Sequence, residues 1–181
     1  MTVLHSDISR VLIEADAIQQ RVGELGATIT ADHVGQEITM VCILKGAFVF
    51  MADLCRHINV PVNTEFMGIS SYGHSTESSG VVRILKDLNE SIEGKNVLIV
   101  EDIVDTGLTV SYLAELLKGR SPKSIKICAL SSKPQCHKKP VTIDYLGFTL
   151  PSEFVVGYGL DYHDYYRNLP YIGVLKPSVY K

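Results

Sequence analysis

The most informative segment of the chain is Val97-Leu-Ile-Val-Glu-Asp-Ile-Val-Asp-Thr-Gly-Leu-Thr109. Its first four residues are apolar and predict a central strand buried on both faces. Glu101 and Asp102 then open a predicted loop that runs to Gly107, and residues 108–118 have the apolar spacing of a helix. The stretch therefore predicts a strand, an acidic loop and the start of a helix in direct succession.

The turn at the start of that helix has the chemistry of a phosphate site. Backbone N–H groups at a helix N-terminus bind anions, and the hydroxyls of Thr106 and Thr109 lie beside them in the sequence. Gly107 lets the backbone close around an anion because it has no Cβ. Taken singly, these residues also fit structural roles, since acidic residues form turns and Thr106 suits a helix cap. Taken together and in this order, they predict a site for a phosphate monoester.

The carboxylates before the turn predict a different partner, because they would repel a bare phosphate. Sugar hydroxyls and a hydrated divalent cation both bind carboxylate oxygens. A phosphate site beside a site for a diol or for magnesium describes a ribose 5-phosphate. Asp105 lies between the two sites in sequence and is predicted to exchange a proton with the group that attacks the sugar.

The remaining elements predict an α/β fold with a mostly parallel, twisted sheet flanked by helices. Strands alternate with helices at the spacing of βαβ units, and in such sheets ligands gather at the carboxyl ends of the strands. The loops of interest therefore follow residues 44, 69, 100 and 130. The predicted strands are residues 38–44, 62–69, 81–85, 97–100, 124–130 and 141–146, and the predicted helices are residues 47–58 and 108–118.

The two ends of the chain and one internal segment are predicted to lie outside the main sheet and its helices. The apolar spacing of residues 6–26 predicts one or two amphipathic helices, with Gly26 as the stop. Residues 70–80 are polar and small and predict a mobile loop. The chain is expected to form a single domain over residues 1–181, with a core at about 36–150. A small hood lobe is expected from residues 151–181, with a contribution from the N-terminus left open.

Composition excludes several classes of protein. The formal charge of −3 argues against a broad nucleic-acid-binding surface. The four cysteines, at positions 42, 55, 128 and 136, have neither zinc-ligand nor redox-motif spacing, which is typical of reduced thiols. The six histidines form no metal motif. The sequence also shows neither a signal peptide nor an apolar stretch near the roughly 20 residues that span a membrane, so a soluble, cytoplasmic protein is expected.

The thirteen quoted residues resemble the phosphoribosyl pyrophosphate signature of the type I phosphoribosyltransferases. Other segments resemble the hypoxanthine-guanine branch of that family and occur in its order, so the resemblance runs from about residue 38 to residue 173. These segments are Leu44-Lys-Gly46, Ser70-Ser-Tyr72, Lys133, Glu153-Phe-Val-Val-Gly-Tyr-Gly-Leu-Asp161 and Tyr166-Arg-Asn-Leu-Pro-Tyr171.

The resemblance implies an activity in purine salvage. The chain is expected to transfer the 5-phosphoribosyl group from phosphoribosyl pyrophosphate to N9 of hypoxanthine, and of guanine as well, with Mg²⁺ as cofactor. The products would be IMP or GMP and pyrophosphate. The family forms homodimers and homotetramers, and the sequence does not decide between them.

The resemblance also implies the roles of individual residues. The 5-phosphate would be bound by Asp105, Thr106, Gly107, Leu108 and Thr109, where Leu108 replaces a lysine that some relatives carry. Glu101 and Asp102 would face the ribose hydroxyls and a magnesium ion, and Asp161 would bind a second one. For Asp105 two roles stay open: a proton acceptor at N7 of the purine, or a hydrogen-bonding group that only positions the base.

The other implied contacts involve the pyrophosphate and the purine. Lys45 and Gly46 would form the pyrophosphate loop, in which the peptide before the lysine can be cis, and Arg167 would be the second pyrophosphate contact. The purine would be bound at O6 by Lys133, stacked by Phe154, packed by Ile103 and contacted by the main chain of Val155. Ser71 and Tyr72 would belong to a loop that closes over the reaction.

Three other readings remain open. A receiver-type phosphoacceptor domain is suggested by residues 97–102 and by Asp144 at the end of a later predicted strand, but it leaves the first 96 residues unexplained. A nucleotide-binding ATPase would need a G-x-x-x-x-G-K-[ST] motif, which is absent. A non-catalytic regulator on the phosphoribosyltransferase fold would be expected to lack residues such as Lys133, Phe154 and Asp161.

Overall fold

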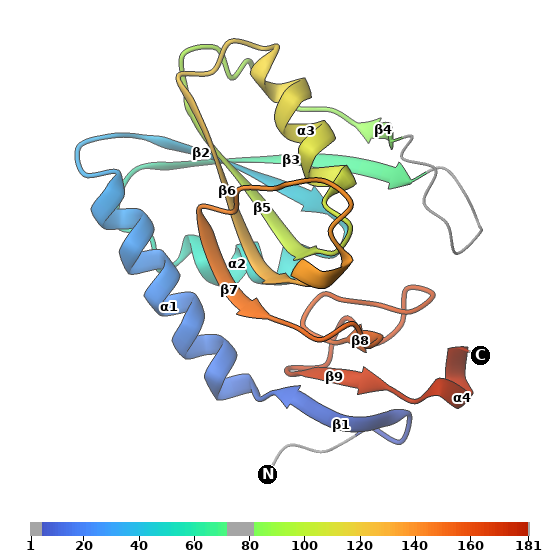
Figure 1. Cartoon of the computed structure of the whole chain (residues 1–181). Coiled ribbons are helices and arrows are strands. Elements are labelled where there is room, and N and C mark those ends of the chain that lie inside the picture. The colour runs from blue at the N-terminus through green and yellow to red at the C-terminus, as the bar shows by residue number, and fades with distance from the viewer. Residues whose placement is uncertain (1–4, 72–81, 181) are drawn as a thin grey trace.

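A six-stranded, mostly parallel sheet forms the centre of the molecule (Figure 1). The structure is a computed structural model that describes residues 5–71 and 82–180. The strand order of the six-stranded sheet is β4-β3-β2-β5-β6-β7, and only β4 is antiparallel to its neighbour. The bounds are β2 (Ile38–Leu44), β3 (Val62–Ser71), β4 (Val82–Lys86), β5 (Asn96–Val104), β6 (Ser124–Ser132) and β7 (Tyr145–Thr149).

Helices cover both faces of this sheet because its central strands are apolar on both faces. Met40 and Cys42 of β2 pack with α1 (Ala15–Asp32) and α2 (Phe48–Cys55). Val41 and Ile43 of the same strand pack on the other face with α3 (Leu108–Lys118). The period-2 alternation of side chains thus divides one strand between two cores. The predicted α/β class, with a mostly parallel sheet, is confirmed.

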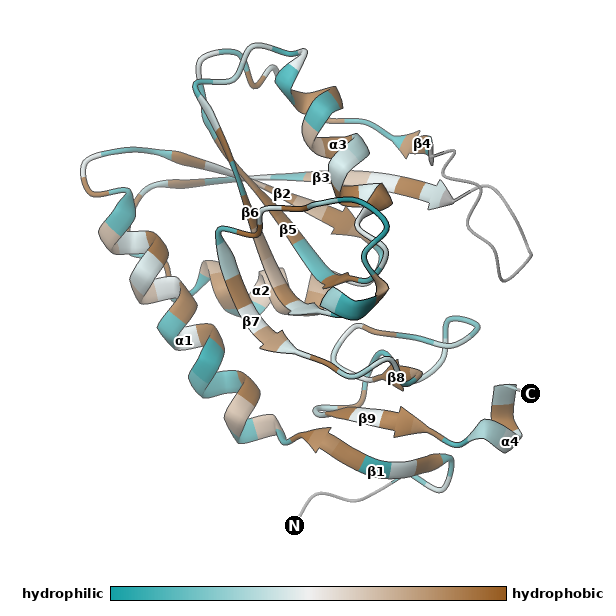
Figure 2. Ribbon diagram, in the orientation of Figure 1, coloured by the Kyte–Doolittle hydropathy of each residue, from teal (hydrophilic) through white to brown (hydrophobic). Residues whose placement is uncertain are grey.

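A second, three-stranded antiparallel sheet joins segments from the two ends of the chain. Its order is β1 (Ile8–Ile13), β9 (Ile172–Leu175) and β8 (Val155–Val156), and a short α4 (Pro177–Tyr180) follows. The three strands are largely apolar in Figure 2 and lie below the main sheet in Figure 1. This sheet draws on the segments assigned to the hood, while the predicted domain boundaries stay a prediction.

The expectation of one or two helices over residues 6–26 is wrong in part. Residues 8–13 form β1, because they pair with β9 at the far end of the sequence. Gly26 does not end α1 but lies inside it, where an added Cβ would come within 2.5 Å of the Cβ of His57. The glycine therefore allows α1 to approach the chain just after α2.

Three other boundaries differ from the expectation. β5 continues to Val104, so Glu101 and Asp102 lie in a strand and not in a loop, because the pairing with β6 extends to residue 132. β7 begins at Tyr145, whereas a strand was expected over 141–146. Asp144 thus precedes a strand, and its carboxylate accepts a hydrogen bond from the N–H of Ile127. The receiver-type interpretation required Asp144 at the end of a strand, so this residue no longer supports it. Most of the predicted loop 70–80 lies outside the described residues.

Among the helices of the described part of the chain, none has both the length and the apolar character needed to span a bilayer.

Candidate active site

The carboxyl ends of β2, β5 and β6 bring three loops to one edge of the main sheet. β2 ends at Leu44 and leads into Lys45, and β5 leads into the turn 105–107. Lys133 follows β6, and its N–H donates to the carbonyl of Val104 at 2.9 Å. Ser131 Oγ donates to the carbonyl of Asp102 at 2.9 Å. The parallel register therefore fixes the three loops relative to one another.

The predicted phosphate turn has the backbone shape that anion binding needs. Gly107 is the N-cap residue of α3, with φ of 76°, a conformation that side chains disfavour. The first amides of α3 have no partner within the helix, and Thr106 Oγ1 accepts the N–H of Leu108 at 3.4 Å. A small cavity of about 70 Å³ lies over the turn, lined by residues that include Glu101, Asp105, Thr106, Gly107 and Thr109.

The segment 138–141 supports this turn from outside. The N–H of Lys138 donates to the carbonyl of Thr106 at 2.8 Å. A Cβ on Gly107 would come within 2.7 Å of Val141 Cγ2 and 3.1 Å of the Lys139 carbonyl oxygen. Gly107 is therefore required for close packing as well as for its φ. Sequence reasoning missed this contact, because it assigned Val141 to a strand.

The two adjacent carboxylates of β5 lie in an environment that disfavours their charge. Glu101 is only 6% exposed. Burial raises its pKa well above the usual range, and the neighbouring Asp102 raises it further. Burial also raises the pKa of Asp102 to about 6, although the N–H of Ile103, which donates to Oδ1 at 3.0 Å, acts in the opposite direction. Glu101 and Asp102 are therefore suited to bind a partner that stabilises their charged, deprotonated form.

A second cavity adjoins the turn and is lined by residues of the predicted base site. It has a volume of about 240 Å³. Its lining contains the residues expected to bind the base together with Leu160, which sequence reasoning missed; the members are Asp102, Ile103, Asp105, Lys133, Phe154, Val155, Leu160 and Asp161. Ile103 and Asp105 line both cavities. The two predicted subsites therefore meet at these two residues.

The predicted stacking ring is itself held by aromatic neighbours. Phe154 stacks on Tyr180 with ring centroids 4.9 Å apart and meets the edge of Tyr162 at 5.6 Å. It remains 37% exposed. Val155 of β8 lies buried beside it. Phe154 and Val155 thus supply one wall of the base cavity, while Ile103 comes from β5 and Lys133 from the loop after β6.

The predicted pyrophosphate contacts lie together with two carboxylates. Lys45 Nζ pairs with Asp164 at 3.0 Å, and Arg167 pairs with Asp161 at 2.8 Å and with Asp164 at 3.0 Å. Arg167 also donates to the carbonyl of Gly159 at 2.6 Å, and its buried Nε has no hydrogen-bond partner in the described structure. The peptide between Leu44 and Lys45 is cis. Asp164 was missed, because only the fold brings it to Lys45.

The backbone of Gly46 ties this cluster to the acidic pair. A Cβ on Gly46 would come within 1.7 Å of Asp102 Oδ2, and a Cβ on Gly159 would come within 2.1 Å of the Gly46 carbonyl oxygen. No side chain fits between these three residues. The loop after β2 therefore contacts both the Asp102 carboxylate and the segment that carries Asp161 and Arg167.

The three predicted metal ligands do not form a closed metal site. Within residues 5–71 and 82–180, no group of three or more His, Cys, Asp or Glu side chains could hold a metal ion. Mg²⁺ usually keeps several waters and is bound by one or two carboxylates together with substrate oxygens. Glu101 and Asp102 fit such a partial ligand set, because a cation would relieve the cost of their burial. Asp161 is paired with Arg167 instead.

The two residues expected in the closing loop are only partly described. Ser71 is the last residue of β3, and Tyr72 lies outside the described residues. Leu108 begins α3, as expected. The other predicted site residues all lie at the carboxyl edge of the main sheet or in the segment 154–167 that faces it.

Comparisons with known proteins give a consistent result. The model of the phosphoribosyl transferase domain family matches residues 12–163. A hypoxanthine-guanine phosphoribosyltransferase of Bacillus subtilis is 52% identical over 179 residues, which cover 99% of each chain. A bifunctional TilS/HprT protein of Listeria innocua is 51% identical over 98% of this chain, which spans only 27% of that protein. A solved hypoxanthine phosphoribosyltransferase of Staphylococcus aureus superposes with a TM-score of 0.94 at 48% identity, covering 98% of this chain and 96% of its own.

Proposed function

This chain belongs to the phosphoribosyltransferase family, and from that membership we propose that it acts in purine salvage as a hypoxanthine-guanine phosphoribosyltransferase. It joins the 5-phosphoribosyl group of phosphoribosyl pyrophosphate to N9 of the purine and releases pyrophosphate. One observation carries the proposal: a small cavity over the phosphate turn and a larger cavity beside Lys133 share Ile103 and Asp105 as a common wall.

In this reaction the phosphate turn anchors the sugar. The amides at the start of α3 and the hydroxyls of Thr106 and Thr109 bind the 5-phosphate. Glu101 and Asp102 accept hydrogen bonds from the ribose hydroxyls. Because Leu108 carries no charge, the backbone supplies most of the anion binding. The sugar is thereby held with its anomeric carbon toward the base cavity.

The base cavity orients the purine and selects it. Lys133 donates to O6 of hypoxanthine or guanine, which disfavours adenine, because the 6-amino group offers no acceptor there. Phe154 and Ile103 enclose the ring. Asp105 lies in the wall common to both cavities, where it accepts the proton of N7 or holds that nitrogen by a hydrogen bond. A sugar with oxocarbenium character also has to be protected from water during the transfer.

Charge on the departing pyrophosphate is met by Lys45 and Arg167. Arg167 binds two oxygens at once through its planar guanidinium, after its bonds to Asp161 and Asp164 are exchanged for bonds to the substrate. A Mg²⁺ ion bound beside Glu101 and Asp102 would neutralise further charge on the phosphate oxygens. In this proposal Asp161 binds a second cation only when Arg167 has moved to the substrate.

A panel of radiolabelled bases with phosphoribosyl pyrophosphate and Mg²⁺ tests the proposal. We expect transfer to hypoxanthine and guanine, none to adenine, and loss of transfer in EDTA with recovery on adding Mg²⁺. Binding of phosphoribosyl pyrophosphate without transfer to any base would instead support a non-catalytic regulator. Stable aspartyl phosphate formed from a small phosphodonor would support the receiver-type reading.

Assembly and location complete the proposal. We expect a cytoplasmic homodimer or homotetramer that binds small-molecule substrates and neither nucleic acid nor membranes. Light scattering coupled to size exclusion gives the number of subunits. A monomeric mass at assay concentration would contradict the expected assembly.

A further inference from the structure

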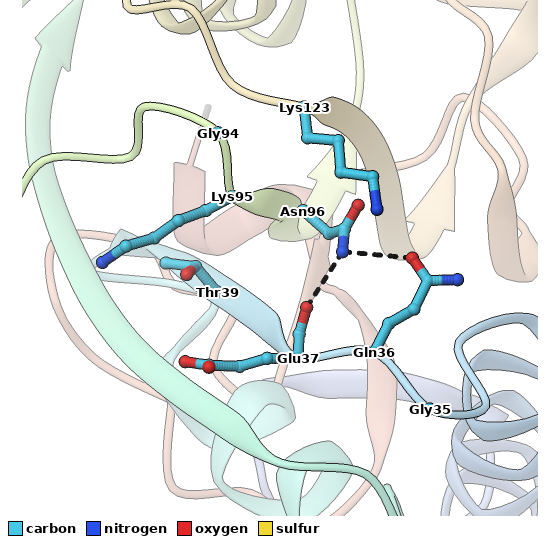
Figure 3. A pocket seen from close by; sticks show the side chains of 8 residues that line it. All are labelled: Gly35, Gln36, Glu37, Thr39, Gly94, Lys95, Asn96 and Lys123. Atoms are coloured by element: carbon cyan, nitrogen blue, oxygen red, sulfur yellow. Dashed lines mark hydrogen bonds between the residues drawn. The ribbon is translucent and has the colours of Figure 1, made fainter.

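A recess of about 260 Å³ lies at the amino edge of the main sheet, opposite the active site. It is formed where β2, β5 and β6 begin, and Figure 3 shows the side chains that line it. At about 3.3 Å per residue, the seven residues of β2 put this edge roughly 20 Å from the carboxyl edge. The recess therefore shares no residue with the site described above.

A network of hydrogen bonds fixes the floor of the recess. Asn96 Nδ2 donates to Gln36 Oε1 at 3.2 Å and to the carbonyl of Glu37 at 3.1 Å (Figure 3). Asn96 Oδ1 accepts the hydroxyl of Ser124 at 2.9 Å. The carbonyl of Lys95 accepts the N–H of Lys123 at 2.9 Å. The side chain of Asn96 is thus fully used, and the backbones of the two lysines are joined at the rim.

Thr39 is the feature of the recess that packing does not explain. Its side chain is 1% exposed, and Oγ1 has no hydrogen-bond partner in the described part of the chain. Buried hydroxyls nearly always have a partner. Thr39 also lines the recess, and Figure 3 shows its side chain there. A ligand in the recess would supply the missing hydrogen bond.

The charged groups of the recess favour an anion. Lys95 and Lys123 form no ion pair within the described residues, and Glu37 is the one carboxylate in the lining. Because Gln36 Oε1 is occupied by Asn96, its amide nitrogen is left as a further donor. The lining therefore offers two ammonium groups, an amide nitrogen and a buried hydroxyl against one carboxylate, and the two lysine side chains extend to opposite sides of the recess in Figure 3. Open space lies where Gly35 and Gly94 would carry a Cβ.

We propose that this recess is a second binding site, for a small phosphate ester that carries hydroxyl groups, such as a phosphorylated sugar. The phosphate binds when the flexible side chains of Lys95 and Lys123 turn toward it, since lysine ammonium groups are common phosphate ligands. Thr39 contributes a hydrogen bond from below, and Glu37 accepts a sugar hydroxyl. The volume admits a ligand smaller than a typical drug molecule. The proposal goes beyond the transferase reaction and does not depend on it.

An NMR titration of the ¹⁵N-labelled protein tests this site and the phosphate turn separately. The probes are inorganic phosphate, ribose 5-phosphate and ribose. We expect both phosphate probes to shift the amides of residues 94–96, with tighter binding of the ester because of Glu37, and ribose alone to leave them unmoved. The amides of residues 106–109 report on the turn in the same spectra. If the amide shifts of residues 94–96 do not change while those of residues 106–109 reach saturation, the proposal is overturned.

Two sets of variants separate binding from packing. The double variant K95A/K123A is expected to weaken phosphate binding at residues 94–96 at least tenfold and to leave the turn unchanged. K118A, which removes an exposed lysine of α3, is the control and should change neither. An unchanged affinity in K95A/K123A would refute the site. If the amides of residues 94–96 shift and those of residues 106–109 do not, the result contradicts the proposed transferase reaction and supports the proposed site in the recess.

Thr39→Val gives the sharpest result, because it removes only the hydroxyl. We expect a higher Tm without ligand, since an unpartnered buried hydroxyl is lost, and about tenfold weaker binding of ribose 5-phosphate at residues 94–96. A higher Tm with unchanged binding would show that Thr39 only packs in the core, and it would remove Thr39 from the site.

Discussion

The two edges of the six-stranded sheet differ in whether their polar side chains already have partners. At the carboxyl edge, burial raises the pKa of Glu101 and of Asp102, and the described structure offers neither carboxylate a cation within ion-pair distance. At the amino edge, Asn96 is satisfied by Gln36, Glu37 and Ser124. The carboxyl edge therefore keeps two buried carboxylates that a bound ligand would stabilise, whereas the amino edge holds its strands together through the Asn96 network even before Thr39 gains a partner. The following predictions test that contrast, from the largest effect to the smallest.

Asp105→Asn is expected to give the largest change. Turnover should fall about 10²- to 10⁴-fold with a modest loss of phosphoribosyl pyrophosphate affinity, because the carboxylate faces both cavities. Single-turnover kinetics measure the chemical step. Glu37→Gln, at the amino edge, is the matched control and should keep full turnover. An unchanged single-turnover rate in Asp105→Asn would remove this residue from the mechanism.

Lys133→Met should raise KM for hypoxanthine and guanine by about 10- to 100-fold, because it keeps the side-chain stem and removes the donor to O6. Lys133 is 8% exposed, so the stem also packs. The free energy of unfolding, measured by urea titration, should change little. A loss of stability that matches the loss of activity would assign Lys133 a structural role instead.

Glu101→Gln should separate function from stability at the carboxyl edge. The ligand-free variant is expected to be about 1–2 kcal/mol more stable at neutral pH, because a neutral amide replaces a buried carboxyl whose charged form is disfavoured. Its affinity for phosphoribosyl pyrophosphate and Mg²⁺ should fall. Urea unfolding with and without ligand measures both. Lower stability without ligand would show that Glu101 already has a good partner.

Asp87→Asn should have the smallest effect, on a pair outside the active site. Hydrogen bonds from Arg120, at 2.8 Å to each oxygen, lower the pKa of Asp87. A lowered pKa stabilises the fold above the ordinary aspartate value and loses this contribution as the pH falls through the folded-state pKa. The variant should lose about 0.5 kcal/mol at pH 7, since the pair is partly exposed.

The measurement for this pair is a double-mutant cycle with Arg120→Met at pH 7 and at pH 2.5. We expect the coupling energy to be smaller at the lower pH, where a larger fraction of Asp87 is protonated. A coupling that stays constant with pH would show that packing, not charge, joins the two residues.

Much of the main sheet and of the site was predictable because both depend on local sequence. The apolar run before Glu101 and the glycine at position 107 identify a strand, a turn and a helix within thirteen residues. The bounds of α3 were predicted correctly, and the family resemblance placed Lys133 and Phe154 at a cavity that the structure contains.

The errors arose where structure depends on distant partners. Residues 8–13 have a spacing that also suits a helix, and their pairing with β9 joins residues more than 150 positions apart. Asp164 gains its role only from Lys45 and Arg167. The amino-edge recess has no local motif, since its lining comes from three separate segments of the chain.

The pairing of β1 with β9 also has a consequence for the order in which the protein matures on the ribosome. β9 ends at Leu175, so the small sheet cannot close until residue 175 has been synthesised. The six-stranded sheet is complete at Thr149, and with it the phosphate turn. A nascent chain should therefore hold a sugar phosphate before it can retain a purine, because residues 154–161 reach the base cavity last.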